Sequence, residues 1–176
     1  VLTPRNFRTQ HYSESLKTSP PDEPYRLSDT WGRLESQQFE GVSPNMWKEF
    51  CLDYQRPILE EFGYVSYGCC EDLTRKMDDV LAIPNLRIFV NGPWTDLQTT
   101  VEKAGDAYSI EWRQNPTDVI FAPDLDDVRT HLENGLKMTQ GCYRGIVLQE
   151  IAEVNDNPER LAEWVRLAKE VSEKYS

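Results

Sequence analysis

Residues 64–71, with the sequence YVSYGCCE, decide how the rest of this chain is interpreted. Their first half consists of strand-forming residues, which predicts a short buried β-strand. Gly68 ends that pattern, and two cysteines and a glutamate follow it, ahead of a segment with helical spacing. Reactive side chains between the carboxyl end of a strand and a helix occupy the position at which α/β folds place their chemistry. The stretch therefore predicts an α/β fold with its site at Cys69, Cys70 and Glu71.

The cysteine pair has two interpretations that the sequence leaves open. Free cysteine is among the most buried residue types, so both thiols would be small packing groups in the core. An adjacent pair beside a carboxylate at the end of a strand is also typical of a thiol or metal site. Alternation along an extended strand puts Tyr67 and Cys69 on one face and Cys70 on the other. We therefore expect Cys69 to face the site and Cys70 to pack in the core.

Strand and helix patterns alternate on both sides of this stretch, which predicts parallel βα repeats. The expected strands cover residues 31–37, 64–69, 86–91, 108–113 and 145–150. The expected helices cover residues 43–62, 72–81, 95–105, 124–138 and 157–174. Repeated strand–helix units form a parallel sheet with right-handed crossovers. Five units fit either part of a (β/α)8 TIM barrel or a smaller, open flavodoxin-like sheet.

The helix expected over residues 43–62 carries three more specific predictions. Ser43 followed by Pro44 is typical of an N-cap and the first helical position. Pro57 should kink the helix or divide it in two. An apolar face is expected from residues at four-residue spacing, which are Met46, Phe50, Tyr54 and Ile58.

The chain divides into an arm and one domain. Residues 1–30 are polar and rich in proline, which predicts a long extended arm, and residues 31–176 are expected to form the folded domain. The chain begins with Val1 rather than methionine. We therefore expect a fragment of a longer protein.

Charge and composition exclude several classes of partner. The 19 basic and 30 acidic residues give a net charge of −11. Nucleic-acid binding needs a basic surface, and an anionic membrane would repel such a chain. No apolar run approaches a membrane span, and the N-terminus lacks the apolar core of a signal peptide. These features predict a cytoplasmic protein with reduced cysteines, acting on a small molecule or on another protein.

Further candidate site residues follow the expected strands. Zinc favours cysteine, histidine and carboxylate ligands, and this predicts metal ligation by Cys69, Cys70 and Glu150. Catalytic roles are assigned to Cys69, Glu71 and Tyr67. A single polar residue at a strand end is more often only solvated, but its recurrence after successive strands favours a shared cleft. The expected substrate-binding residues are Glu35, Gln37, Asn91, Trp94, Glu111, Arg113 and Asn115.

Several motifs resemble the uroporphyrinogen decarboxylase superfamily, and in particular a bacterial branch with a YGCCE motif. The similar segments are Ser43-Pro44 before a helix, Tyr67-Gly68-Cys69-Cys70-Glu71, Ile83-Pro84-Asn85-Leu86-Arg87, Asn115-Pro116 and Asn157-Pro158-Glu159-Arg160-Leu161. The resemblance covers the chain from Trp31 to its end. It implies the C-terminal half of a (β/α)8 barrel, which would need its missing N-terminal half or a second copy in a homodimer.

The superfamily includes corrinoid-dependent methyltransferases, which pass a methyl group to a thiol at a zinc site. The resemblance therefore implies zinc and a partner protein that carries a corrinoid. Cys69 matches one metal ligand of these enzymes, whereas Tyr67 stands at the histidine position and Ala152 at the second cysteine. Cys70 or Glu150 would have to replace the missing ligands.

Three functions remain open. The first is a methyl-group transferase that acts on a small molecule at a Cys-centred site. The second is a decarboxylase of a porphyrinogen-like or other polycarboxylate, which should show clustered basic residues in its cleft. Only Arg113 meets that condition in the sequence. The third is a non-catalytic binding domain or an inactive half-barrel.

Overall fold

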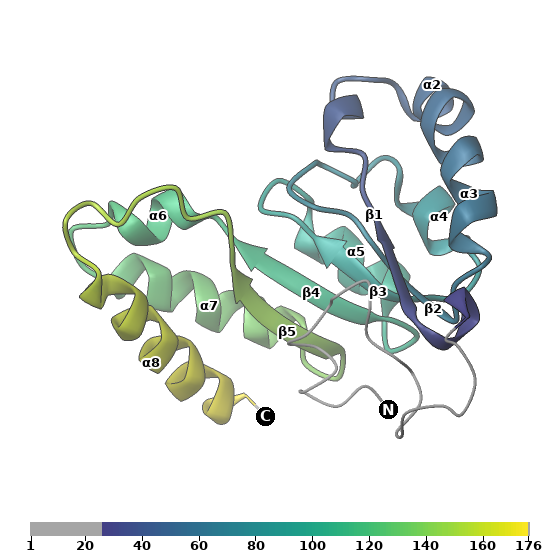
Figure 1. The fold of residues 1–176 in the computed structure, drawn as a ribbon. Helices are drawn as coiled ribbons and strands as arrows, with labels where there is room; N and C mark the ends of the chain where they lie inside the picture. The colour runs from purple at the N-terminus through teal and green to yellow at the C-terminus, as the bar shows by residue number, and fades with distance from the viewer. Residues whose placement is uncertain (1–25, 176) are drawn as a thin grey trace.

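A computed structural model describes residues 26–175 and contains five parallel strands in alternation with helices (Figure 1). The strands lie side by side in chain order, and the sheet is not closed. They are β1 (Trp31–Leu34), β2 (Tyr64–Tyr67), β3 (Leu86–Asn91), β4 (Ser109–Gln114) and β5 (Tyr143–Leu148). The α/β class and the parallel βα repeats are therefore confirmed. The order has no reversal, which excludes the 2-1-3-4-5 order of a flavodoxin-like sheet.

Helices follow each strand, and those after consecutive strands pack against one another. The longer ones are α3 (Asp53–Leu59), α5 (Leu97–Ala104), α7 (Asp126–Met138) and α8 (Glu159–Lys174). The shorter ones are α2 (Pro44–Trp47), α4 (Met77–Leu81), α6 (Pro116–Ile120) and the single turns η1 (Leu27–Asp29) and η2 (Gln37–Phe39). Right-handed crossovers between strands that advance in one direction place their helices on one face of the sheet.

Two apolar clusters fill the space between sheet and helices. One joins β2 and β3 to α2, α3 and α4, with Tyr67 and Phe89 at its centre. The other joins β4 to α7 and α8 around Trp112. Apart from an irregularity at Arg87, where the register between β2 and β3 shifts, side chains alternate along the strands, so the neighbours of these residues point to the opposite face. That face carries Trp31, Ile88 and Val90 as a third, small cluster, and the charged residues Arg33, Glu111 and Arg113.

The helix expected over residues 43–62 differs from its prediction in two ways. It is divided by a π-helical segment, η3 (Lys48–Leu52), which lies between α2 and α3 and precedes Pro57 by one turn. The expected apolar face is not buried: Met46, Phe50, Tyr54 and Ile58 are each at least 53% exposed. Trp47, Cys51, Leu52 and Leu59 face the sheet instead.

Other boundaries shift at glycine and proline. The second strand ends at Tyr67 rather than at residue 69, because Gly68 has a φ of 113°. The following helix begins at Met77 instead of residue 72, and the turn between them forms the site. Helix α6 was not predicted; Asn115 caps its first turn ahead of Pro116.

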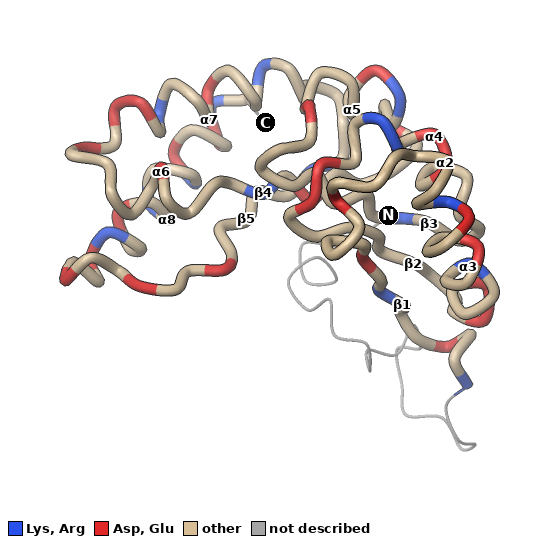
Figure 2. The backbone as a smooth tube through the Cα atoms, turned by 90° about the horizontal axis from the view of Figure 1, so that it is seen from above, with Lys and Arg blue, Asp and Glu red and all other residues tan. Residues whose placement is uncertain are grey.

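Acidic residues are distributed over helices and loops, with fewer lysines and arginines among them (Figure 2). No helix in residues 26–175 is both long and apolar enough to cross a membrane. The arm predicted for residues 1–30 lies outside the described residues except for Arg26–Thr30, which include η1. Strand β1 begins at Trp31, and the expected division into an arm and a domain stays a prediction.

Candidate metal centre

The turn after β2 is held in place by a buried carboxylate. Glu71 is fully buried, and its Oε1 accepts hydrogen bonds from the backbone N–H of Ser36 at 2.7 Å and from the Ser36 hydroxyl at 3.2 Å. Its Oε2 accepts from the backbone N–H of Cys69 at 2.8 Å. Both oxygens of Glu71 are therefore occupied within the protein. The structure places this predicted catalytic residue behind the cysteines, where it fixes their backbone.

The segment after β3 supports the same turn from the other side. Thr95 donates its hydroxyl to the carbonyl of Glu71 at 3.0 Å and accepts from the N–H of Leu73 at 3.0 Å. Gly92 lies so close that a Cβ there would be 2.8 Å from the carbonyl oxygen of Cys69. Sequence reasoning missed the roles of Ser36, Gly92 and Thr95, although a glycine directly after a strand often marks a close approach of two backbones.

Glu150 completes the site from the far end of the sheet. It follows β5, and its Oε1 accepts from Cys69 Sγ at 3.2 Å while its Oε2 accepts from Cys70 Sγ at 2.9 Å. Its φ of 60° is unusual for a residue other than glycine. The ligand atoms of Cys69, Cys70 and Glu150 all lie within 4.8 Å of one another, so the three residues could hold a metal ion. This is the ligand set that the sequence predicted.

The orientation expected for the two cysteines is wrong in part. Cys69 is buried, but Cys70 is only half-buried, and both thiols point to Glu150. Strand alternation does not extend to them because Gly68 turns the chain first. Tyr67 remains in the strand and faces the helices, where its hydroxyl donates to Gln55 Oε1 at 2.6 Å. Tyr67 and Cys69 therefore do not share a face.

A buried ion-pair network lies beside Cys69. Arg113 Nε donates to Glu111 Oε1 at 2.8 Å, and its Nη1 donates to Cys69 Sγ at 3.3 Å. Arg113 Nη1 also lies 3.9 Å from Glu150 Oε1. From β1, Arg33 Nη2 donates to the carbonyl of Gly68 at 3.3 Å and lies 3.9 Å from Glu111 Oε1. Glu111 and Arg113 were expected to bind substrate. The structure places them beside Cys69 as an ion pair, in which Arg113 contacts both Glu111 and Cys69 Sγ.

These contacts keep the thiols protonated. Burial raises the pKa of Cys69 far above its usual range, and hydrogen bonds with Glu35 and Glu150 raise it further, against the opposing charge of Arg113. Burial and the same Glu150 carboxylate raise the pKa of Cys70 to about 11. The hydrogen bond from Cys70 lowers the pKa of Glu150, so that carboxylate is ionised. Without a metal, the site is two neutral thiols bound to one carboxylate.

Of the other predicted site residues, some lie near Cys69 and Cys70 and others do not. Glu35 lies close to Cys69, as its effect on the pKa of that thiol indicates. Asn91 turns toward α5, where its amide donates to the carbonyls of Gly92 and Thr95 and accepts from Thr100. Gln37 and Trp94 are exposed, and Asn115 caps α6. The structure therefore brings Glu35, Glu111 and Arg113 to the cysteines and directs Asn91 away.

A metal ion at this place would displace two thiol protons. The site would then hold two thiolates and a carboxylate around a divalent cation, with one negative charge left over. Arg113 already donates to Cys69 Sγ, and Arg33 and Arg113 together would offset the charge of Glu111 and of the occupied site. Soft thiolate ligands with one carboxylate suit zinc better than magnesium or calcium, which prefer oxygen. The donor set and its neighbouring cation therefore fit a thiophilic ion.

Comparison of the chain with protein-family models, with characterised proteins and with solved structures gave no significant match. The resemblance stated from the sequence motifs thus stays a prediction.

Proposed function

We propose that this chain binds zinc through Cys69, Cys70 and Glu150 and uses it to transfer a group to a small molecule. The observation that carries the proposal is the convergence of three ligand atoms within 4.8 Å, although Glu150 lies 80 residues beyond Cys70 in the chain. Three protein ligands leave the fourth tetrahedral position of zinc open, which is typical of catalytic rather than structural zinc sites. The open position would receive the substrate.

The reaction we favour is methyl transfer to a thiol. Zinc would supply a Lewis acid that lowers the pKa of a substrate thiol. Around it, Arg113 would hold Cys69 in place, while Glu111 would fix the guanidinium of Arg113. Glu71 would keep the cysteine backbone rigid from behind. The methyl donor would be a corrinoid on a partner protein, as the sequence resemblance to uroporphyrinogen decarboxylase-like methyltransferases implies.

The ligand set departs from that of the methyltransferases, because Cys70 and Glu150 take the places of a histidine and a second cysteine. The proposal of a half-barrel is supported by the unbroken strand order, since all strands of a (β/α)8 barrel follow one another in this way. A site at the carboxyl ends of β2 and β5 also agrees with where such barrels carry their chemistry.

A polycarboxylate decarboxylase is less well supported. Such an enzyme needs guanidinium groups that are available to substrate carboxylates. Here both arginines of the network, Arg33 and Arg113, lie beside Glu111, and Arg113 is almost fully buried. The positive charge of these two guanidinium groups is thus largely neutralised by carboxylates of the same chain.

Metal titration tests the proposal directly. We expect one equivalent of zinc per chain, and cobalt in its place should give the intense visible bands of a tetrahedral thiolate site. Cys69→Ser, Cys70→Ser and Glu150→Gln should each weaken zinc binding by more than about 100-fold. Cys142→Ser is the matched control, since Cys142 is half-buried but lies in the loop before β5. Equal binding by all four variants would contradict the assignment.

Activity is tested with methylcobalamin and a small thiol acceptor. The zinc-loaded chain should demethylate the corrinoid, and the three ligand variants should not. Zinc binding without demethylation would keep the metal site and reject methyl transfer from a corrinoid.

A further inference from the structure

Both ends of the sheet lack a neighbouring strand in the part of the chain that the structure describes. Among residues 26–175, β1 pairs only with β2 and β5 pairs only with β4. Each of these strands therefore presents one row of unpaired backbone N–H and C=O groups. The layer of helices ends at the same two places, with α3 beside β1 and α8 after β5 (Figure 1).

At the β1 end, four exposed apolar side chains form what we call the edge stripe: Met46, Phe50, Tyr54 and Ile58. A π turn holds more residues than the 3.6 of an α turn, so η3 keeps a four-residue spacing nearly parallel to the helix axis. The four side chains therefore lie in a line along the helix. In an uninterrupted α-helix, residues at this spacing would rotate progressively around the helix axis.

Contacts with α4 show which way the edge stripe faces. Lys48 pairs with Asp79, and Arg56 donates to the carbonyl of Ala82 at 3.0 Å, so α4 lies on the flank of Lys48 and Arg56. Helical spacing puts Phe50 and Tyr54 on the opposite flank. The edge stripe therefore faces away from the neighbouring helix and toward the open side of β1.

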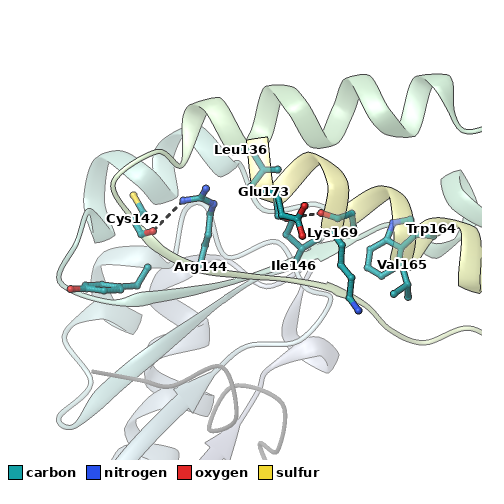
Figure 3. Close-up of a pocket in the computed structure, with 11 residues that line it drawn as sticks. Leu136, Cys142, Arg144, Ile146, Trp164, Val165, Lys169 and Glu173 are labelled. Carbon is teal, nitrogen blue, oxygen red and sulfur yellow. Dashed lines mark hydrogen bonds between the residues drawn. The ribbon is translucent and has the colours of Figure 1, made fainter. Parts of the chain in front are cut away.

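At the β5 end, a groove of about 710 Å³ lies between β5 and α8 (Figure 3). Its apolar lining consists of Leu136, Ile146, Trp164, Val165 and Ala168. Arg144, Lys169 and Glu173 supply its charge, with one positive charge in excess. Two buried N–H groups in it, Arg144 Nε and Trp164 Nε1, have no acceptor among the described residues. We call this the β5–α8 groove.

We propose that the edge stripe and the β5–α8 groove are the two halves of one interface, and that the chain forms a dimer with two-fold symmetry. The edge stripe of each copy packs into the groove of the other, and β1 of one copy lies beside β5 of its partner. If the two-fold axis runs parallel to the strands, the strands of both copies point in the same direction. The two sheets then form one closed ring of strands. This inference does not depend on the metal site.

The two surfaces match in chemistry as well as in position. Exposed Glu49 and Asp53 flank Phe50 and Tyr54 on the helix, whereas the groove carries Arg144 and Lys169. The carboxylates beside the edge stripe therefore oppose the excess positive charge of the groove. A single occupant, a second copy, thus covers both apolar surfaces and both strand edges.

Sedimentation of the full chain measures the association. We expect the mass to rise from 20.5 kDa to twice that value as concentration increases to ~200 µM, a range that includes weak micromolar dimers. Tyr54→Glu and Val165→Glu should each leave a folded monomer, because each buries a charge at both interfaces of the ring. Trp94→Glu is the control, since Trp94 is 63% exposed but lies after β3, in the middle of the sheet. Circular dichroism verifies that each variant is folded.

Mixing the two monomeric variants identifies the arrangement. In a mixed dimer one interface joins the unchanged Tyr54 to the unchanged Val165, so an equimolar mixture should recover part of the dimer. A Val165→Glu chain that still dimerises while Tyr54→Glu does not would mean that the edge stripe pairs with itself, and this overturns the proposal. So does a wild-type chain that stays monomeric at ~200 µM, which would mean that a second copy does not cover the two ends.

Discussion

Glu150 holds both thiols of the site by hydrogen bonds, and this determines how they react. Burial and the Glu150 carboxylate raise the pKa of Cys70 to about 11, so at neutral pH almost none of it is thiolate. Alkylation of the metal-free protein at Cys70 should therefore rise about tenfold per pH unit from pH 7 to pH 10 without a plateau. Mass spectrometry of iodoacetamide adducts measures the rate at each pH.

The same experiment on Glu150→Gln provides the control. Removing the carboxylate lowers the pKa of Cys70, because a negative charge no longer opposes the thiolate. Alkylation at pH 8 should become faster in this variant. An unchanged rate would show that Glu150 does not hold the thiol in solution.

Glu71 illustrates a carboxylate with a positional role. In Glu71→Gln one oxygen becomes an NH2 group, which cannot accept from the backbone N–H of Ser36 or Cys69. A buried donor is left without its acceptor, so we expect the free energy of unfolding to fall by about 1–3 kcal/mol. Urea denaturation measures the loss, with Glu153→Gln as an exposed control. No loss would mean that the turn rearranges around the amide.

At the scale of elements, the site depends on how closely the segment after β3 approaches the turn after β2. Gly92→Ala would bring a Cβ within 2.8 Å of the Cys69 carbonyl oxygen and within 3.1 Å of the Cys70 backbone. The turn must then move, and we expect zinc affinity to fall by about 10–100-fold, as when a group that orients a ligand is lost. Isothermal titration measures it.

Gly41→Ala is the matched control, because a Cβ at Gly41 meets nothing within 4 Å. If both glycine variants bind zinc as tightly as the wild type, the spacing of the two turns has no influence on the ligands.

The elements also show what the sequence could predict. The alternation of strand and helix patterns predicted all five strands, and the three residues that could hold a metal were selected because they lie at strand ends. The π segment was not predictable from Pro57 alone, because wide turns depend on packing around the helix. Counting apolar residues at four-residue spacing selected Met46 and Phe50 for the core, whereas Trp47 and Cys51 occupy it. Periodicity finds an apolar face but does not say what it packs against.

The predicted orientation of the two cysteines was wrong for a related reason. Alternation assumes that a strand continues, and Gly68 with its φ of 113° ends β2 one residue before Cys69. The roles of Ser36, Gly92 and Thr95 were invisible because each acts through a backbone contact between segments far apart in the chain. Such contacts depend on the fold and leave no local pattern.

At the scale of the whole molecule, a metal ion would connect the turn after β2 to the segment after β5. A ligand that binds only the folded state raises stability by RT ln(1 + [L]/Kd), about 2.7 kcal/mol at 100 times Kd. For a domain of this size we expect saturating zinc to raise Tm by roughly 5–11 °C. Differential scanning calorimetry with and without zinc measures the shift.

Glu150→Gln should remove this shift while changing Tm little in the absence of zinc, since Glu150 is exposed. A shift that persists in Glu150→Gln would locate the zinc elsewhere on the protein.

The distance in sequence between the cysteines and Glu150 also matters while the chain is being made. Glu150 follows Cys70 by 80 residues, and translation at ~5–20 residues per second supplies it roughly 4–16 s later. Until then the adjacent thiols of Cys69 and Cys70 lack the Glu150 carboxylate, and for about the first half of this time they also lack Arg113 of β4. A newly synthesised chain thus passes through an interval in which it is open to oxidants and to foreign soft metals, and only completion of β5 ends that interval.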